Sequence, residues 1–571
     1  MTKEIRERQL GFRHDEALDN FQAVVGGWLV PFLKEWINAG SQPVLGEADV
    51  RRLQERLSEL FEQKGPLPSG YEWLPELAQR LSGAMRFNRR NFVNIHPTPH
   101  VPAVLASTLV SLQNPNNIVE HVSEQTTKLE REVIAWMAKN LVGFSEGAWG
   151  NMVSGGTVAN MTALLAARDY SYRKISQPRP VDVRSRGLYG LPQGVVLATK
   201  GSHYSVKKAL WFLGMGDENV IPISVCHDEL VRRQVQRDQT FISGIRDKSW
   251  SEPLHTALNK DKELGDSELE NFYSGKQRPF GLQPLNSEIL KSLYGCFVYG
   301  TPLIAYVFTI GTTDTGTIEK PNGLALELLE KEDIYIHADA AAGGFAMLHQ
   351  RVRSMVNGLE RVRSVTIDGH KLGHLPYPNG AIIFRERGWM HEILHDAPYL
   401  RDLAPTLEGS RPGSHAGALW AAIKDMDSSR IYVRWLDRLF DFISCLVKGI
   451  ESGRKFQVLH EVHLTTVAVA PLPHSGSTRR ELNELVLKIH ELIDNDKMGN
   501  AFLVNIDKGL SGIKVRNDNL FSAETDISVL LEDVYCLRIV ATNPAVEPND
   551  ADELLSYLDE KLTLARIALN R

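Results

Sequence analysis

The chain has 571 residues, of which 43% are hydrophobic and 23% are charged, which is typical of a folded globular protein rather than a disordered or fibrous one. Its formal net charge of −6 at pH 7 does not favour binding to nucleic acid or to an anionic membrane. Four widely spaced cysteines with no CxxC pair exclude a disulfide scaffold and a cysteine zinc knuckle. Because the N-terminus is charged and no apolar run is long enough to span a bilayer, we expect a cytoplasmic protein.

Residues 1–130 are expected to form an N-terminal helical segment. Apolar residues recur at helical spacing over 21–37 and 50–63, which predicts amphipathic helices. Residues 86–130 are rich in Pro, Asn and His and predict ordered loops around one helix. Because such a segment is too thin to enclose a core of its own, we expect it to pack on the main body or on a partner subunit.

Short apolar runs alternate with helical stretches between residues 131 and 440. Continuous Val- and Ile-rich runs are typical of strands buried on both faces of a mostly parallel sheet, and they lie at 194–199, 219–224, 303–311, 334–339, 364–368 and 380–385. Ligands bind such sheets at the carboxyl ends of the strands. A polar stretch at about 225–285 predicts an insertion, and residues 441–571 restart the alternation as a smaller α+β domain.

Three motifs at predicted strand ends carry candidate chemistry. The Ser-Gly-Gly-Thr run at 154–157 precedes a strong helix, whose free N–H groups can bind an anion. Asp339 and Lys371 each follow the end of another strand. Alone, these motifs are better explained as helix caps and a structural or exposed lysine. Together, an anion cradle, a carboxylate and an amine are the set that pyridoxal phosphate requires.

With these motifs the sequence resembles the group II pyridoxal-phosphate-dependent amino acid decarboxylases, nearest the bacterial tyrosine decarboxylase branch. The resemblance rests on SGGTVAN, GSHYS, HADAAAGGF, TIDGHK and EGSRPGS and covers roughly residues 90–425. It implies an α/β protein of fold type I, with a mostly parallel seven-stranded sheet flanked by helices. The cofactor-binding domain would span 131–440, between the N-terminal helical or dimerisation segment (1–130) and the small C-terminal α+β domain (441–571).

The resemblance also implies roles for individual residues. Lys371 would bind the cofactor covalently, Asp339 would pair with its pyridine nitrogen, and His203 would stack on its ring and help to position the substrate carboxylate. Further cofactor-binding candidates in the same chain are Gly156, Thr157, Thr312, Ala341 and His370. Ser410, Gly413 and Ser414 would reach the phosphate of the other subunit, so the resemblance implies an obligatory homodimer with a shared active site.

The implied reaction is loss of CO₂ from an amino acid, followed by protonation of the α-carbon. We favour Tyr399 as the proton donor and Tyr377 as a pocket residue. The resemblance places the Pro-containing segment 94–100 at the substrate side chain, which makes candidates of His96, Pro97, Thr98 and His100. An aromatic substrate such as tyrosine and an acidic one such as aspartate or glutamate both remain open.

Other interpretations also remain open. The GSRPG run at 409–413 is similar to a motif of sphingosine-phosphate-lyase-type enzymes, which break C–C bonds. An aldehyde-forming decarboxylase-oxidase and a catalytically inactive binding protein on the same fold are further alternatives. No metal site is expected, because HEVH at 460–463 has no third ligand at a standard spacing.

Overall fold

The computed structural model describes residues 24, 26–27, 30–31, 34, 47–63, 73–82, 89–223, 239–245, 249–259, 286–319, 323–393, 406–425, 430–453, 455–472, 478–496, 503–507 and 535–569. The chain divides into two compact units, residues 1–91 with 491–503 and residues 92–490 with 504–571. In the first unit, helices α4 (Glu47–Gln63) and α5 (Leu74–Ser82) contact each other. The predicted domain boundaries at 130 and 440 stay predictions.

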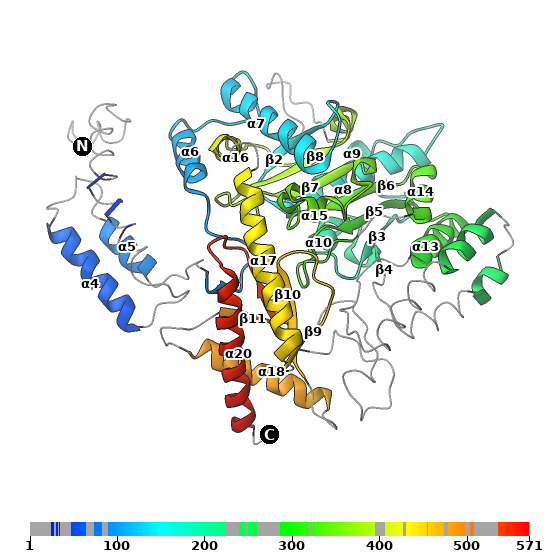
Figure 1. The fold of residues 1–571 in the computed structure, drawn as a ribbon. Coiled ribbons are helices and arrows are strands. Elements are labelled where there is room, and N and C mark those ends of the chain that lie inside the picture. The colour runs from blue at the N-terminus through cyan, green and yellow to red at the C-terminus, as the bar shows by residue number, and fades with distance from the viewer. Residues whose placement is uncertain are drawn as a thin grey trace. The chain divides into compact units, whose positions relative to one another are not determined.

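A seven-stranded sheet forms the centre of the second unit (Figure 1). Its strands follow the order β2 (Trp149–Val153), β8 (Gly380–Phe384), β7 (Ser364–Asp368), β6 (Tyr335–Asp339), β5 (Leu303–Thr309), β3 (Val195–Thr199) and β4 (Val220–Ile223). Neighbours from β7 to β4 are parallel, whereas β8 is antiparallel to both β7 and β2. The expected mostly parallel α/β sheet is therefore confirmed.

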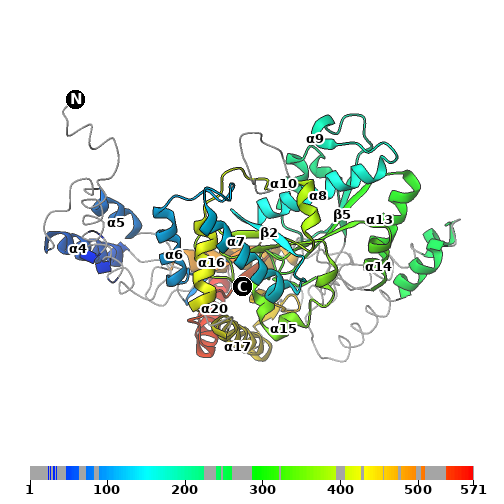
Figure 2. The same cartoon turned by 90° about the horizontal axis from the view of Figure 1, so that it is seen from above.

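Helices flank this sheet (Figure 2). Helix α8 (Gly156–Ile175) contacts β5, β6, β7 and β8, and α10 (Ser205–Phe212) packs on α8. Strands β3, β5, β6, β7 and β8 are buried along their whole length, because helices on both faces leave no solvent-facing side. The other helices of this part are α6 (Val101–Leu112), α7 (Glu124–Met137), η2 (Ala138–Val142), α9 (Val183–Arg186), η3 (Asp217–Asn219), α13 (Asn286–Tyr299), α14 (Gly323–Lys331), η4 (Phe345–Leu348), α15 (Gln350–Arg353), η5 (Leu359–Arg361), η6 (Arg387–Glu392) and α16 (Ser414–Asp425).

A second sheet has the strand order β1 (Asn91–Phe92), β11 (Leu503–Asp507), β12 (Cys536–Val540), β10 (Thr466–Pro471) and β9 (Phe456–Val458). Strand β10 is antiparallel to β9 and β12, and β11 is antiparallel to β12. The helices in this part of the chain are α17 (Arg430–Gly453), α18 (Arg479–Asp494) and α20 (Pro548–Ala568). Glu547 and Asp550 form a capping box at the start of α20, which satisfies N–H groups that the helix itself leaves open.

Within the predicted insertion at about 225–285, the structure describes only residues 239–245 and 249–259, of which 239–243 and 249–259 are helical; the rest lies outside the described residues. Among the helices that the structure describes, none has the length and apolar character to cross a membrane.

Candidate active site

The predicted motifs meet at one edge of the seven-stranded sheet. Strands β2, β3, β6 and β7 all end there, because they share one direction. Strand β8 begins at the same edge, where Gly380 pairs with both Val153 and Asp368. The ends of four strands therefore deliver the 154–157 run, the His203 loop, Asp339 and the segment carrying Lys371 to one place.

Two glycines let the start of α8 approach the lysine segment. A Cβ atom on Gly156 would lie 2.9 Å from Asp368 Oδ2 and 3.0 Å from the Cβ of Ala341, and one on Gly155 would lie 3.3 Å from His370 Cε1. Any larger residue at Gly156 would have to displace these neighbours. The run thus forms a close-fitting helix start, of the kind whose N–H groups can bind an anion.

Lys371 lies beside a buried carboxyl group. Its Nζ is 3.3 Å from Asp368 Oδ2. Burial raises the pKa of Asp368 to about 6, although the neighbouring lysine acts in the opposite direction. Asp368 Oδ1 is buried and has no hydrogen-bond partner among the described residues. A buried polar atom without a partner indicates a place for another polar group.

His370 is held as a neutral imidazole beside the lysine. Its Nδ1 accepts a hydrogen bond of 3.2 Å from the backbone N–H of Asn379. Burial, followed by the charge of Lys371, lowers the pKa of His370 to about 3. The Tyr377 ring stacks on this imidazole at 3.8 Å between centroids.

Asp339 is oriented by two donors at the end of β6. Its Oδ1 accepts from the backbone N–H of Ala341 at 3.1 Å, and its Oδ2 accepts from Asn160 Nδ2 at 2.7 Å. Burial lowers the pKa of His203, which feels the charges of both Asp339 and Lys371 in opposite directions. The three residues to which the sequence assigned the central chemistry are therefore electrostatic neighbours.

The predicted substrate segment adjoins the lysine segment. The His96 ring meets that of Tyr377 edge-on at 5.2 Å, and burial together with the charge of Lys371 lowers the pKa of His96. The backbone N–H of His100 donates to the carbonyl of His374 at 2.7 Å. The side chain of His100 instead lies 3.2 Å from the Asp425 carboxylate, so the two histidines of this segment face different groups. Pro97 is buried and Thr98 exposed.

The remaining predicted residues occupy the surroundings. Thr157 is half-buried in the first turn of α8. Thr312 Oγ1 accepts from the N–H of Thr317 at 3.0 Å, and its methyl group lies beside Gly201, in the loop that carries His203. Tyr399 lies outside the described residues.

The segment 406–414 begins beside the Ser-Gly-Gly-Thr run (154–157) of the same chain. The N–H of Ser154 faces both Glu408 carboxylate oxygens at 3.3 Å. Ser410 Oγ accepts from Asn116 Nδ2 at 3.0 Å. Gly413 packs closely on Thr126, and Ser414 opens α16. Contact of these residues with a partner's cofactor stays a prediction.

Three side chains at this edge were absent from the predicted set: Asn160, Asp368 and Glu319. Asn160 lies four residues after Gly156 on α8, so helical spacing places both on one face, and this signal was available. Asp368 ends a buried strand as Asp339 does, which is the same signal. Glu319 follows no strand end; an isolated bridge between Ile310 and Ile318 brings it to β5, and no local pattern reveals that pairing.

The residues present fit pyridoxal phosphate. The glycine cradle that a Cβ would fill suits the phosphate, and the Asp339 carboxylate, with both oxygens hydrogen-bonded, suits a protonated ring nitrogen. The Lys371 amine suits the aldehyde. Among the described residues, no group of three or more His, Cys, Asp or Glu side chains is placed to hold a metal ion.

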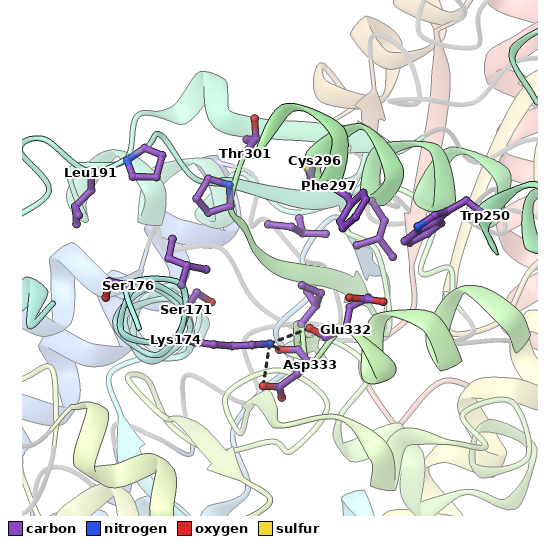
Figure 3. Close-up of a pocket in the computed structure, with 17 residues that line it drawn as sticks. Ser171, Lys174, Ser176, Leu191, Trp250, Cys296, Phe297, Thr301, Glu332 and Asp333 are labelled. Carbon is purple, nitrogen blue, oxygen red and sulfur yellow. Dashed lines mark hydrogen bonds and ion pairs between the residues drawn. The ribbon is translucent and has the colours of Figure 1, made fainter. Parts of the chain in front are cut away.

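A cavity of about 550 Å³ lies at the opposite edge of the sheet (Figure 3). It is lined by the start of β5 at Leu303, by Trp250 and Phe297, and by Lys174, which pairs with Asp333 at 3.0 Å. Among the predicted site residues that the structure describes, none lines it. The cavity is therefore separate from the candidate active site.

Comparison with known families matches residues 298–470 to the pyridoxal-dependent decarboxylase conserved domain. The aspartate 1-decarboxylase of Aliivibrio fischeri is 26% identical over 424 residues, covering 70% of this chain but 66% of that protein. The L-tyrosine decarboxylase of Enterococcus faecium is 22% identical over 506 residues, covering 76% and 78% of the two chains. The L-2,4-diaminobutyrate decarboxylase of Rhizobium meliloti is 27% identical over 307 residues, 54% and 48% of the two chains.

Solved structures share the fold. The glutamate decarboxylase domain of a Vibrio parahaemolyticus diaminobutyrate protein superimposes with a TM-score of 0.69 at 17% identity, covering 99% of this chain and 100% of that one. Oryza sativa TDC, crystallised with PLP and tryptamine, superimposes with a TM-score of 0.70 at 16% identity, covering 97% and 99%. At such identities the likeness concerns the fold alone.

Proposed function

We propose that the chain, which is similar to pyridoxal-dependent amino acid decarboxylases, removes the α-carboxylate of an L-amino acid whose side chain is acidic or aromatic. The observation that carries the proposal is the convergence of Lys371, Asp339 and His203 at one sheet edge, where His203 feels the charges of both other residues.

The proposed roles follow from this geometry. When bound, pyridoxal phosphate draws electrons from the bond that breaks at the substrate's α-carbon. Lys371 would hold the cofactor, and Asp339 would keep a proton on its ring nitrogen. The first turn of α8 would bind the phosphate through Gly156 and Thr157, with Ala341, His370 and Thr312 around the ring.

Two tyrosines are candidates for returning a proton to the α-carbon. We retain Tyr399 as the proposed donor and Tyr377 as a wall of the pocket. Burial raises the pKa of Tyr377 to about 12, so its hydroxyl keeps its proton at neutral pH. Its ring lies between those of His370 and His96, which suits a wall better than a mobile acid.

The substrate side chain would meet the segment 96–100. His96 is the member of this segment that faces Tyr377 and feels Lys371. A neutral imidazole can donate a hydrogen bond to a side-chain carboxylate or to a phenol oxygen. The first relatives reported above act on aspartate and on tyrosine, so both substrate classes belong to the proposal.

The test is release of CO₂ from the purified holoenzyme, measured for each of the twenty amino acids, cysteine sulfinate and 2,4-diaminobutyrate. We expect amine and CO₂ in equal amounts from aspartate or glutamate, or from tyrosine or another aromatic amino acid. Aldehyde instead of amine would indicate the decarboxylase-oxidase. Cleavage of a phosphorylated amino alcohol without CO₂ would indicate the C–C lyase, and binding of cofactor without turnover would indicate the inactive binding protein.

Replacing Lys371 by Ala should abolish both turnover and the visible absorbance band near ~420 nm that a lysine-bound pyridoxal aldehyde gives, because no amine remains to bind it. Spectra of the reconstituted variant, before and after borohydride, check this expectation. Lys174→Ala is a matched control, since Lys174 lines the separate cavity. Retention of the band in Lys371→Ala would refute the assignment of the lysine.

We also propose a homodimer in the cytoplasm. Helix α6 exposes an apolar stripe formed by Val101, Leu105, Leu109 and Leu112, each at least half exposed. Such a contiguous stripe on a helix indicates an interface. The helix packs on α16, where Val110 contacts Gly417, and α16 begins at Ser414. A second copy bound to α6 would therefore lie near the 410–414 segment predicted to serve a shared site.

A further inference from the structure

Asn160 forms hydrogen bonds with both Asp339 and Ser205, and Ser205 in turn lies beside the His203 imidazole. It is buried in α8, and its Nδ2 donates to Asp339 Oδ2 at 2.7 Å and to Ser205 Oγ at 2.9 Å. Its Oδ1 accepts from Thr366 Oγ1 at 2.7 Å. An ionised carboxylate can only accept hydrogen bonds, so the amide nitrogen must face Asp339. The orientation of the Asn160 amide is thereby fixed.

This orientation makes Ser205 Oγ an acceptor for Asn160. The proton of the Ser205 hydroxyl is then available to His203 Nδ1, 2.8 Å away. The backbone N–H of Ser205 also points at Nδ1, at 3.3 Å. With two donors directed at it, Nδ1 acts as an acceptor. A neutral imidazole carries one proton, which then resides on Nε2.

The surroundings keep this imidazole neutral. Burial is the main cause that lowers the pKa of His203; Lys371 acts in the same direction and Asp339 against it. Asn160 and Ser205 therefore form a hydrogen-bonded connection between Asp339 and His203.

We propose that Asn160 and Ser205 are positioning residues that hold the proton of His203 on Nε2, so that the stacking imidazole offers a hydrogen-bond donor to the substrate α-carboxylate. The substrate part of this inference rests on the proposed function, whereas the tautomer is a property of the protein alone. Asn160 serves the reaction twice, because the same amide group holds the Asp339 carboxylate.

The first test is nitrogen NMR of the apoprotein carrying isotope-labelled histidine, with the His203 signals assigned from a His203→Gln sample. We expect the Nδ1 of His203 to show the shift of an unprotonated ring nitrogen and Nε2 that of a protonated one. A proton on Nδ1 in the unaltered protein would overturn the proposal.

Ser205→Ala removes the nearer of the two donors. We expect the Nδ1 and Nε2 shifts of His203 to move toward each other, as the proton distributes over both nitrogens. Ser205→Thr, which keeps a hydroxyl, should restore the original shifts. Unchanged shifts in Ser205→Ala would show that the hydroxyl does not set the tautomer.

Asn160→Ala should disturb both Asp339 and His203, the two ends of this series of hydrogen bonds. We expect the His203 shifts to move and the apparent affinity for pyridoxal phosphate, titrated spectroscopically, to fall by about tenfold or more, as for other supporting hydrogen bonds of a cofactor site. The control is Thr162→Ala, a buried residue of α8 whose hydroxyl donates to the carbonyl of Val158. If Asn160→Ala does not fold, Asn160→Ser replaces it. Weaker cofactor binding without any change at His203 would overturn the link between the two residues.

These readouts are independent of turnover. If no amino acid releases CO₂ but His203 carries its proton on Nε2, the proposed function fails and the assigned tautomer stands. If CO₂ is released while His203 carries its proton on Nδ1, the positioning proposal fails alone.

Discussion

Glu319 illustrates how a single buried group affects the protein at the residue scale. It accepts hydrogen bonds from the Thr199 hydroxyl and from the N–H of Thr309, the latter at 2.6 Å. Burial nevertheless raises the pKa of Glu319 to about 7, and the nearby Asp339 acts in the same direction. Between about pH 4.3 and pH 7, the folded protein therefore keeps a proton on Glu319. The unfolded chain, with an ordinary glutamate pKa, has lost that proton in the same range.

Replacing Glu319 by Gln should therefore stabilise the protein at neutral pH. The sign follows from linkage: where the folded state binds more protons, the free energy of unfolding falls as pH rises, and glutamine removes this fall. Urea unfolding at pH 4.5 and pH 8 should show a gain for the variant that grows with pH, on the order of 3 kcal/mol at the upper end. An equal difference from the unaltered protein at both pH values would contradict the prediction.

At the scale of elements, a buried ion pair joins parts of the chain far apart in sequence. Arg411 pairs with Glu130 of α7 and donates to the carbonyl of Met152 in β2 at 2.9 Å. Glu130 also accepts from the N–H of Met152 at 2.8 Å. One guanidinium and one carboxylate therefore fix the 406–414 segment against the strand that leads into the cradle.

Glu130→Gln should destabilise the protein strongly, because it leaves the buried Arg411 without its charge partner. Loss of one member of a buried pair typically costs about 3–5 kcal/mol, measurable as a drop in the free energy of urea unfolding. Glu120→Gln is the control, since Glu120 pairs with Arg131 at the surface and should cost less than about 1 kcal/mol. Equal effects of the two substitutions would refute the role given to the buried pair.

At the scale of the whole molecule, the apolar stripe on α6 should hold two subunits together. Replacing Leu105 and Leu109 by Glu places charges where we propose that the subunits meet, and sedimentation velocity should then show monomers. Ile567→Glu is the control, because Ile567 is 67% exposed on α20 and Leu109 is 61% exposed on α6. A dimer that survives the double substitution would exclude this face as the interface.

A shared site would also allow two defective chains to complement each other. Lys371→Ala and Ser414→Asp should each be inactive alone, the second because a new carboxylate would repel the cofactor phosphate. Random reassociation of the two variants should restore roughly a quarter of the activity, since half of the dimers are mixed and each contains one intact site. No recovery after verified exchange of subunits would mean that Ser414 serves its own chain.

The sequence predicted strands of the seven-stranded sheet, their alternation with helices and the residue types at their ends. Apolar runs such as 303–309 and 364–368 have one stable location, a sheet covered on both faces, and the groups that follow Asp339 and Val153 must then lie at its edge. The antiparallel direction of β8 was not predictable, because a buried run looks the same in either direction. Asn160 shares a helix face with Gly156, a signal that the sequence did offer, but its partners on β6 and α10 are known only from the tertiary structure.

From the sequence, local periodicity predicted the strand ends that carry an amine, a carboxylate and a glycine-rich helix start, and the family resemblance added the imidazole. Only the tertiary structure determined the pKa values and the hydrogen-bond partners of these groups. The pKa values of Asp368 and Glu319, the fixed amide of Asn160 and the two donors on His203 depend on burial and on contacts between segments far apart in the sequence, such as those that carry Asn160 and Thr366. Burial and hydrogen-bond direction are properties of the packed chain, which no local pattern encodes.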